Sequence, residues 1–227
     1  MFTALLLVSS AQAFGYSGTL TSADGGLVGT GSWVDKSLLK AADQPNWTAP
    51  VFSWLVTENA DLTWHYHYTL TVYKKDISHM TVEASPTFGA SNIFNSTWPA
   101  AKIEIADFTS QQGSPNMPGS IHGIKFDETI GTTVHVAFDS DRLPVWGDLY
   151  AKDGTAGGGI WNTVWNAGFT NPDSDPVGPP ANGPFDYHIL VPDTSGPPPP
   201  PVPEPASLVT LSLGIGMLMI KRGNLRR

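Results

Sequence analysis

The stretch from Leu62 to Tyr73 constrains the fold most, because its side chains alternate strictly along the chain. The even positions are apolar or aromatic: Leu62, Trp64, Tyr66, Tyr68, Leu70 and Val72. The odd positions are mostly polar: Thr63, His65, His67, Thr69, Thr71 and Tyr73. A period of two over twelve residues indicates a β-strand with one face towards a core and the other towards solvent or a ligand.

Shorter segments of similar character follow one another along the chain, with turn signals such as Asp24-Gly25-Gly26 between them. Strands are expected over residues 14–20, 27–33, 51–57, 78–84, 102–108, 121–126, 132–139, 144–150, 160–169 and 187–191. No segment has a convincing amphipathic helical pattern. The sequence therefore predicts an all-β fold for residues 14–191, an antiparallel β-sandwich of jelly-roll-like type.

The composition says how such a domain is held together. The chain has no cysteine, so neither a disulfide nor a thiol nucleophile or ligand is available to it. Eight Trp, ten Phe and six Tyr supply large apolar side chains, so stability is expected to come from packing.

The N-terminus has the pattern of a signal peptide over residues 1–13. Residues 2–8 form a short apolar region, and Ala11 and Ala13 flank a small-residue cleavage site before Phe14. No Lys or Arg precedes the apolar region, although signal peptides have a positively charged start. We therefore expect the true start codon to lie upstream of Met1.

The C-terminus combines a proline run, an apolar segment and a basic end. Residues 192–201 favour polyproline II and predict a semi-rigid stalk. Residues 206–220 are uncharged and would form a helix of about 22 Å, short of the roughly 30 Å hydrocarbon core but long enough for a short transmembrane helix. The basic residues after it predict a cytoplasmic C-terminus, whereas a buried core helix is the alternative; these residues are Lys221, Arg222, Arg226 and Arg227.

A six-residue motif at the start of the apolar segment indicates what the C-terminal order of parts is for. The motif consists of Val202, Pro203, Glu204, Pro205, Ala206 and Ser207. Motif, apolar segment and basic end (residues 202–227) together resemble the PEP-CTERM sorting domain, and weaker similarities at 123–127 and 144–154 resemble exported β-rich proteins with that tail. The resemblance implies export, transient anchoring in the inner membrane, and recognition by an exosortase-type membrane protease or transpeptidase that removes the tail. An ordinary C-terminal anchor is the alternative.

The charge distribution excludes one class of partner. The chain has 12 Lys and Arg against 20 Asp and Glu, and four of these cations and one acid, Glu204, lie in the tail. The remaining 8 cations against 19 acids make the exported part strongly acidic. Nucleic acid is therefore not expected as a partner.

Two places in the sequence are weak candidates for metal binding. His65 and His67 lie two residues apart on the polar face of the long strand, where both imidazoles could approach one ion if a third ligand came from a neighbouring strand. Asp173 and Asp175 resemble the start of a calcium loop, but Pro176 and Asn182 occupy the positions where an EF-hand needs Gly and Glu. Solvent-facing histidines and a solvated acidic loop are the plainer interpretations, and no cofactor other than calcium is indicated.

No catalytic motif is present in the sequence, so no catalytic residue is predicted. The leading hypothesis is a structural or adhesive protein of the cell envelope or extracellular matrix, with extracellular polysaccharide as a candidate partner. A carbohydrate-binding module is the first alternative, because Trp47, Trp98, Trp161 and Trp165 lie where aromatic rings could be exposed. A secreted hydrolase is the second, since folding could bring an acid pair such as Asp139 and Asp148 together.

Overall fold

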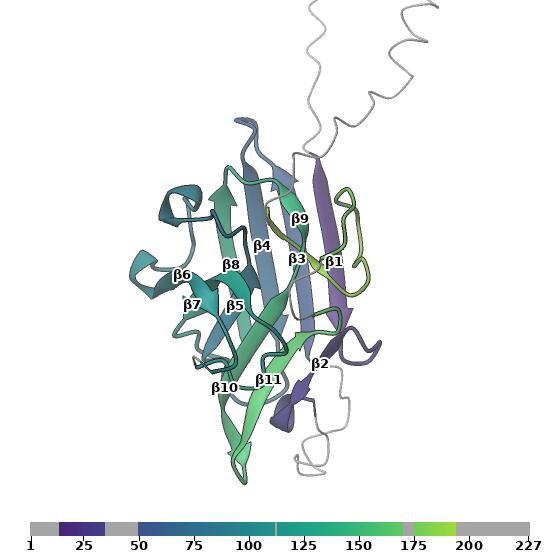
Figure 1. Cartoon of the computed structure of the whole chain (residues 1–227), viewed down its shortest axis with the longest axis vertical. Coiled ribbons are helices and arrows are strands. Elements are labelled where there is room, and N and C mark those ends of the chain that lie inside the picture. The colour runs from purple at the N-terminus through teal and green to yellow at the C-terminus, as the bar shows by residue number, and fades with distance from the viewer. Residues whose placement is uncertain (1–13, 35–49, 112, 170–174, 194–227) are drawn as a thin grey trace, which may run out of the picture. The chain divides into compact units, whose positions relative to one another are not determined.

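The computed structural model describes residues 14–34, 50–111, 113–169 and 175–193 (Figure 1). All of them belong to the first of the two units into which the chain divides, Met1–Gly196. Every paired strand in this part is antiparallel, and helix is limited to three-residue 3₁₀ turns: η1 (Gly31–Trp33), η4 (Ala90–Asn92) and η5 (Ala100–Lys102). The predicted all-β class is confirmed.

The first sheet contains the strand on which the prediction was based. Its order is β1 (Gly15–Thr21), β3 (Val51–Glu58), β4 (Trp64–Thr71) and β8 (Thr133–Ser140). Along β4 the even positions are buried and the odd positions are partly exposed, as the alternation predicts. The strand begins two residues later than expected, because Leu62 has a φ of 67° and is exposed in the turn before it.

The second sheet has six strands and the third has two. The order in the second is β2 (Leu27–Thr30), β11 (Ile160–Asn166), β10 (Leu149–Gly157), β5 (His79–Glu83), β7 (Ile121–Asp127) and β6 (Ile103–Phe108). The third pairs β12 (Ile189–Pro192) with β9 (Pro144–Gly147).

The two large sheets share one hydrophobic core. The rings of Phe138 on β8 and Phe126 on β7 lie 5.9 Å apart, although the strands belong to different sheets. Tyr66 and Tyr68 of β4 are fully buried in the same cluster as Met80 of β5. This arrangement is consistent with the predicted β-sandwich.

The strand β12 closes the described part of the chain. All four of its residues are buried, and the hydroxyl of Tyr68 donates a hydrogen bond to the Leu190 carbonyl oxygen (3.0 Å). The strand predicted over residues 187–191 is thus present, shifted towards the C-terminus. The strand predicted over 144–150 is wrong as one element, because the chain changes sheets at Asp148, between β9 and β10.

Several predicted segments lie outside the described residues. They are the signal peptide (1–13), residues 194–201 of the stalk and the whole tail (202–227), including the apolar segment 206–220. Among the residues that the structure describes, no helix is long and apolar enough to cross a membrane.

Candidate functional site

A buried carboxylate marks the point where the chain leaves the two-stranded sheet. Asp148 follows β9 and precedes β10, and none of its surface is exposed. Its backbone N–H donates to Oε2 of Glu83 on β5 (2.9 Å), and its carbonyl oxygen accepts from the Glu83 N–H (2.9 Å). Gly147 lets Glu83 come this close, because a Cβ there would lie 3.0 Å from Oε2 of Glu83 and 2.5 Å from Cγ2 of Val191.

A buried amide orients the Asp148 side chain. Nδ2 of Asn166, at the end of β11, donates to Oδ1 of Asp148 (2.7 Å). Oδ1 of the same amide accepts the backbone N–H of Leu149 (2.8 Å), the first residue of β10. Because both ends of the Asn166 amide are bonded, the carboxylate has a fixed position at this change of sheets.

A tight turn brings an imidazole to the same place. The backbone N–H of His188 donates to the carbonyl oxygen of Phe185 (2.8 Å), and the two central residues, Asp186 and Tyr187, have φ values of 46° and 62°. Two residues with positive φ are typical of a type I′ turn, but Tyr is a costly residue for that region. Backbone strain of this kind is common at functional sites.

The imidazole itself is buried and closely packed. His188 is 4 % exposed, and its ring lies against the backbone of Gly168, where a Cβ would stand 2.7 Å from the ring atoms Nδ1 and Cε1. Nδ1 lies 3.3 Å from the carbonyl oxygen of Phe185, to which an N–H at this position donates. The other ring nitrogen, Nε2, is buried without a hydrogen-bond partner among the described residues.

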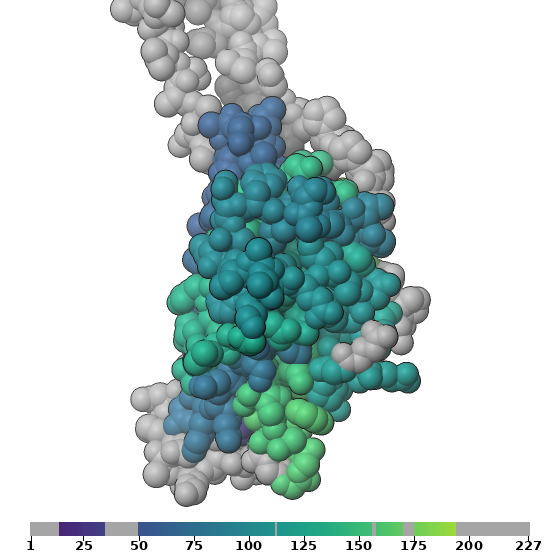
Figure 2. Space-filling model, turned by 90° about the vertical axis from the view of Figure 1, so that its left-hand side faces the viewer, coloured from purple at the N-terminus to yellow at the C-terminus, as the bar shows by residue number. Residues whose placement is uncertain are grey.

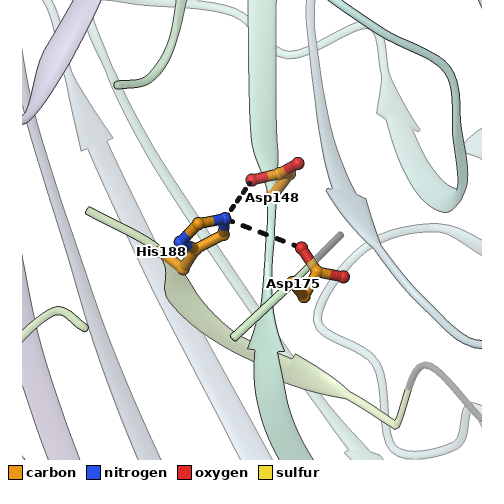
Figure 3. A group of neighbouring side chains, drawn as sticks. All are labelled: Asp148, Asp175 and His188. Carbon is orange, nitrogen blue, oxygen red and sulfur yellow. Dashed lines mark ion pairs between the residues drawn. The ribbon is translucent and has the colours of Figure 1, made fainter. Parts of the chain in front are cut away.

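Two carboxylates converge on this second nitrogen (Figure 3). Nε2 of His188 lies 3.6 Å from Oδ1 of Asp148 and 3.7 Å from Oδ1 of Asp175, whose side chain is 11 % exposed. The three ligand atoms all lie within 4.8 Å of one another. Asp148, Asp175 and His188 are hereafter called the buried triad, and they form the one group of three or more His, Cys, Asp or Glu in the described part of the chain that could hold a metal ion.

The histidines predicted as weak metal candidates take part in pairs instead. Nδ1 of His65 lies 2.7 Å from Oδ1 of Asp139, its cross-strand neighbour on β8, and the rings of His67 and His135 stack at 6.1 Å. Partial burial lowers the pKa of His67, and the neighbouring His135 and His65 lower it further.

The partner of His65 has a perturbed pKa as well. Partial burial of Asp139 works to raise its pKa, but hydrogen bonds from Asn95, His65 and Asn59 outweigh burial and hold the pKa below its usual value. The acid pair Asp139 and Asp148 is divided between two environments, since Asp139 bonds to His65 while Asp148 faces His188.

The other predicted site residues have different outcomes. Asp175 is a member of the buried triad, whereas Asp173 lies outside the described residues. So do Ala11 and Ala13 of the signal cleavage site, the sorting motif 202–207, and the basic residues of the tail. Sequence reasoning missed His188 altogether, although a charged or polar residue inside an apolar run, as in residues 187–191, is a signal that could have found it.

An open cavity of about 740 Å³ lies elsewhere, beside β6 and β7. Its wall includes Phe88, Phe94, Trp98, Asn95 and His122. Figure 2 shows the face of the molecule on which the blue-green middle part of the chain, to which these residues belong, is exposed. The indole N–H of Trp98 donates to the carbonyl oxygen of Asp127 (2.9 Å) and so fixes the ring at the cavity.

Comparison with known proteins gives no relative: no family model matches the chain, and neither a curated protein nor a solved structure is significantly similar to it.

Proposed function

We propose that this chain is an exported cell-envelope or extracellular-matrix protein with a structural or adhesive role. In this proposal a signal peptide directs export, and the all-β domain is a jelly-roll-like sandwich held off the membrane by the stalk. The segment 206–220 spans the membrane with its C-terminus in the cytoplasm. An exosortase-type enzyme then recognises the PEP-CTERM motif and releases the domain to the cell surface or matrix.

The observation that best supports a tethered domain is the way the described chain ends. The buried strand β12 is the last strand of the domain and directly precedes the proline run in sequence, and the backbone N–H of Asp193 donates to the Leu143 carbonyl oxygen (2.8 Å). Oδ2 of Asp193 also lies 3.8 Å from a guanidinium nitrogen of Arg142. A pull on the stalk therefore acts on a buried, hydrogen-bonded strand, which is a suitable attachment for a surface protein.

The proposed role of the PEP-CTERM motif in sorting is tested by replacing Glu204, the one acidic residue of the motif. We expect Glu204→Ala to abolish removal of the tail in the producing cell, so that the intact mass keeps residues 206–227 and surface delivery is lost. Glu128→Ala is the matched control, since Glu128 is an exposed residue of the folded domain that pairs with Lys102. Unchanged processing and release of the Glu204→Ala protein would contradict the exosortase proposal.

Carbohydrate binding is the second candidate, and the cavity beside β6 and β7 is the observation that favours it. Aromatic walls with a few polar groups suit sugar rings, and Trp98, Phe94, Asn95 and His122 supply both kinds. The tryptophans proposed for this role differ in position: Trp161 is 37 % exposed with Nζ of Lys152 at 4.9 Å from its ring, and Trp47 lies outside the described residues.

A glycan array tests this candidate with the full chain in mild detergent. We expect a bound polysaccharide fragment to be lost from Trp98→Ala and retained by Trp161→Ala, provided that thermal melting shows both variants to be folded. Binding that survives Trp98→Ala, or no binding by the parent chain, would contradict a carbohydrate role for this cavity.

A further inference from the structure

We propose that the buried triad binds one divalent transition metal ion of the zinc class, through Nε2 of His188 and one carboxylate oxygen each from Asp148 and Asp175. The assignment goes beyond the proposed function and does not depend on the sorting tail or on carbohydrate binding. It rests on distances, on the direction of the imidazole and on buried charge.

The distances fit a shared ion better than direct hydrogen bonds. Hydrogen bonds between an imidazole and a carboxylate are about 2.7–3.2 Å long, and Nε2 of His188 is 3.6 and 3.7 Å from its two carboxylate oxygens. Ligand atoms about 2.1 Å from a tetrahedral ion stand roughly 3.4 Å from one another. Two of the three separations between ligand atoms are therefore close to the spacing that a shared ion requires, and all three are within 4.8 Å.

The direction of the imidazole supports the same conclusion. An N–H at Nδ1 of His188 points to the Phe185 carbonyl oxygen, so that the lone pair of a neutral ring lies on Nε2. Histidines that bind metals usually donate their other N–H to a carbonyl or carboxylate, which fixes the tautomer. Here the lone pair faces two carboxyl groups, an arrangement that a shared cation would stabilise.

The triad also concentrates negative charge in a buried place. Asp148 has no exposed surface, Asp175 is mostly buried, and Glu83 accepts the Asp148 N–H just beside them. A divalent ion held by both carboxylates would offset their charge. Buried carboxylates are generally paired or coordinated for this reason.

The ligand types decide the class of ion. Calcium and magnesium prefer oxygen ligands throughout, while an imidazole with carboxylates suits zinc and its neighbours in the first transition series. Three protein ligands leave a fourth position for water. The calcium suggested by the sequence around Asp175 is thus replaced in this proposal by a borderline ion such as Zn²⁺.

Such an ion would join the change of sheets at Asp148 to the connection between β11 and β12, which supplies both other ligands. Asp148 lies directly before β10, Asp175 in the connection after β11, and His188 at the end of that connection, directly before β12. Metal binding would therefore stabilise the position of β12, the strand that directly precedes the proposed stalk. Because the ion binds only the folded state, it should raise the melting temperature.

The test uses the full chain, stripped with a chelator and held in mild detergent, with Zn²⁺ as the probe. We expect calorimetric titration to show one ion per chain. At a hundredfold excess over Kd the melting temperature should rise by about 5–10 °C. Asp175→Asn and His188→Gln should each weaken binding at least about tenfold, because each removes a ligand. Asp175 lies closest to solvent in the triad, so its near-isosteric variant is expected to fold.

The matched control is His65→Gln, which breaks another histidine–aspartate contact of the domain, that with Asp139. It should leave both Zn²⁺ affinity and the rise in melting temperature unchanged. The proposal is overturned if the stripped parent does not bind Zn²⁺, if folded Asp175→Asn binds it as tightly as the parent does, or if Ca²⁺ binds more tightly than Zn²⁺.

Discussion

Replacing Trp146 with Ala is expected to lower the free energy of unfolding by about 3–5 kcal/mol, the usual cost of removing a large buried aromatic side chain. Trp146 lies on β9, opposite Leu190 of β12, and only 1 % of its surface is exposed. Its ring stacks on that of Phe185 at 5.8 Å, next to the turn that positions His188. The substitution leaves a cavity where the indole ring packs in the folded protein, beside β12 and the ring of Phe185. Chemical denaturation followed by circular dichroism measures the loss.

Trp161→Ala is the control for this prediction, because it removes the same side chain from the surface. Trp161 is 37 % exposed on β11, and the ammonium group of Lys152 lies over its ring. We expect it to cost no more than about 1 kcal/mol. Equal losses for Trp146→Ala and Trp161→Ala would show that the contact between β9 and β12 does not support the domain.

Asn166→Ala is expected to cost about 3 kcal/mol, since it leaves two buried groups without the hydrogen bonds that they have in the folded protein. The Leu149 N–H loses its acceptor and the Asp148 carboxylate loses the Asn166 amide. Hydrogen bonds to charged groups and unsatisfied buried donors are the two most expensive losses of this kind. Chemical denaturation followed by circular dichroism again measures the loss. A chelator is added to both proteins, so that no ion bound to the buried triad contributes to the stability that is compared.

The control for Asn166 is an asparagine with the same bonds in a more exposed place. Oδ1 of Asn92 accepts the Gly89 N–H (2.9 Å) and Nδ2 donates to Oδ1 of Asp141 (2.9 Å). Because water can replace these bonds, Asn92→Ala should cost less than about 1 kcal/mol. A loss for Asn166→Ala as small as that for Asn92→Ala would contradict the view that burial makes the Asn166 bonds important.

The alternation of β4 was predictable because a half-buried strand imposes period two on its own side chains. Tyr66 and Tyr68 are buried and His65 and His67 are not, as the sequence indicates. The same rule predicts that Val134, Val136 and Phe138 of β8 face the core, and the structure confirms it. Local patterns of this kind require no knowledge of which strands pair.

The change of sheets at Asp148 was not predictable from local pattern. Residues 144–150 have the composition of one apolar strand, yet the chain divides into β9 and β10 around a buried carboxylate. What stabilises Asp148 comes from far along the chain, from Glu83 and Asn166. Only the tertiary structure shows that these side chains meet.

The buried triad illustrates the same limit for a site. The sequence pattern groups Asp175 with Asp173 as the start of a calcium loop and does not connect either residue with His188. The triad has no regular spacing in sequence, since Asp148 lies between β9 and β10, and Asp175 and His188 lie thirteen residues apart in the connection between β11 and β12. A metal site assembled in this way has no motif, in contrast to an EF-hand, where one loop supplies the ligands.

An anomalous difference map from crystals grown with Zn²⁺, collected on either side of the zinc absorption edge, tests the metal assignment most directly. We predict one strong peak about 2.1 Å from Nε2 of His188 and from a carboxylate oxygen each of Asp148 and Asp175. A map without a peak between these three side chains, in crystals where Zn²⁺ occupies other positions, would contradict it.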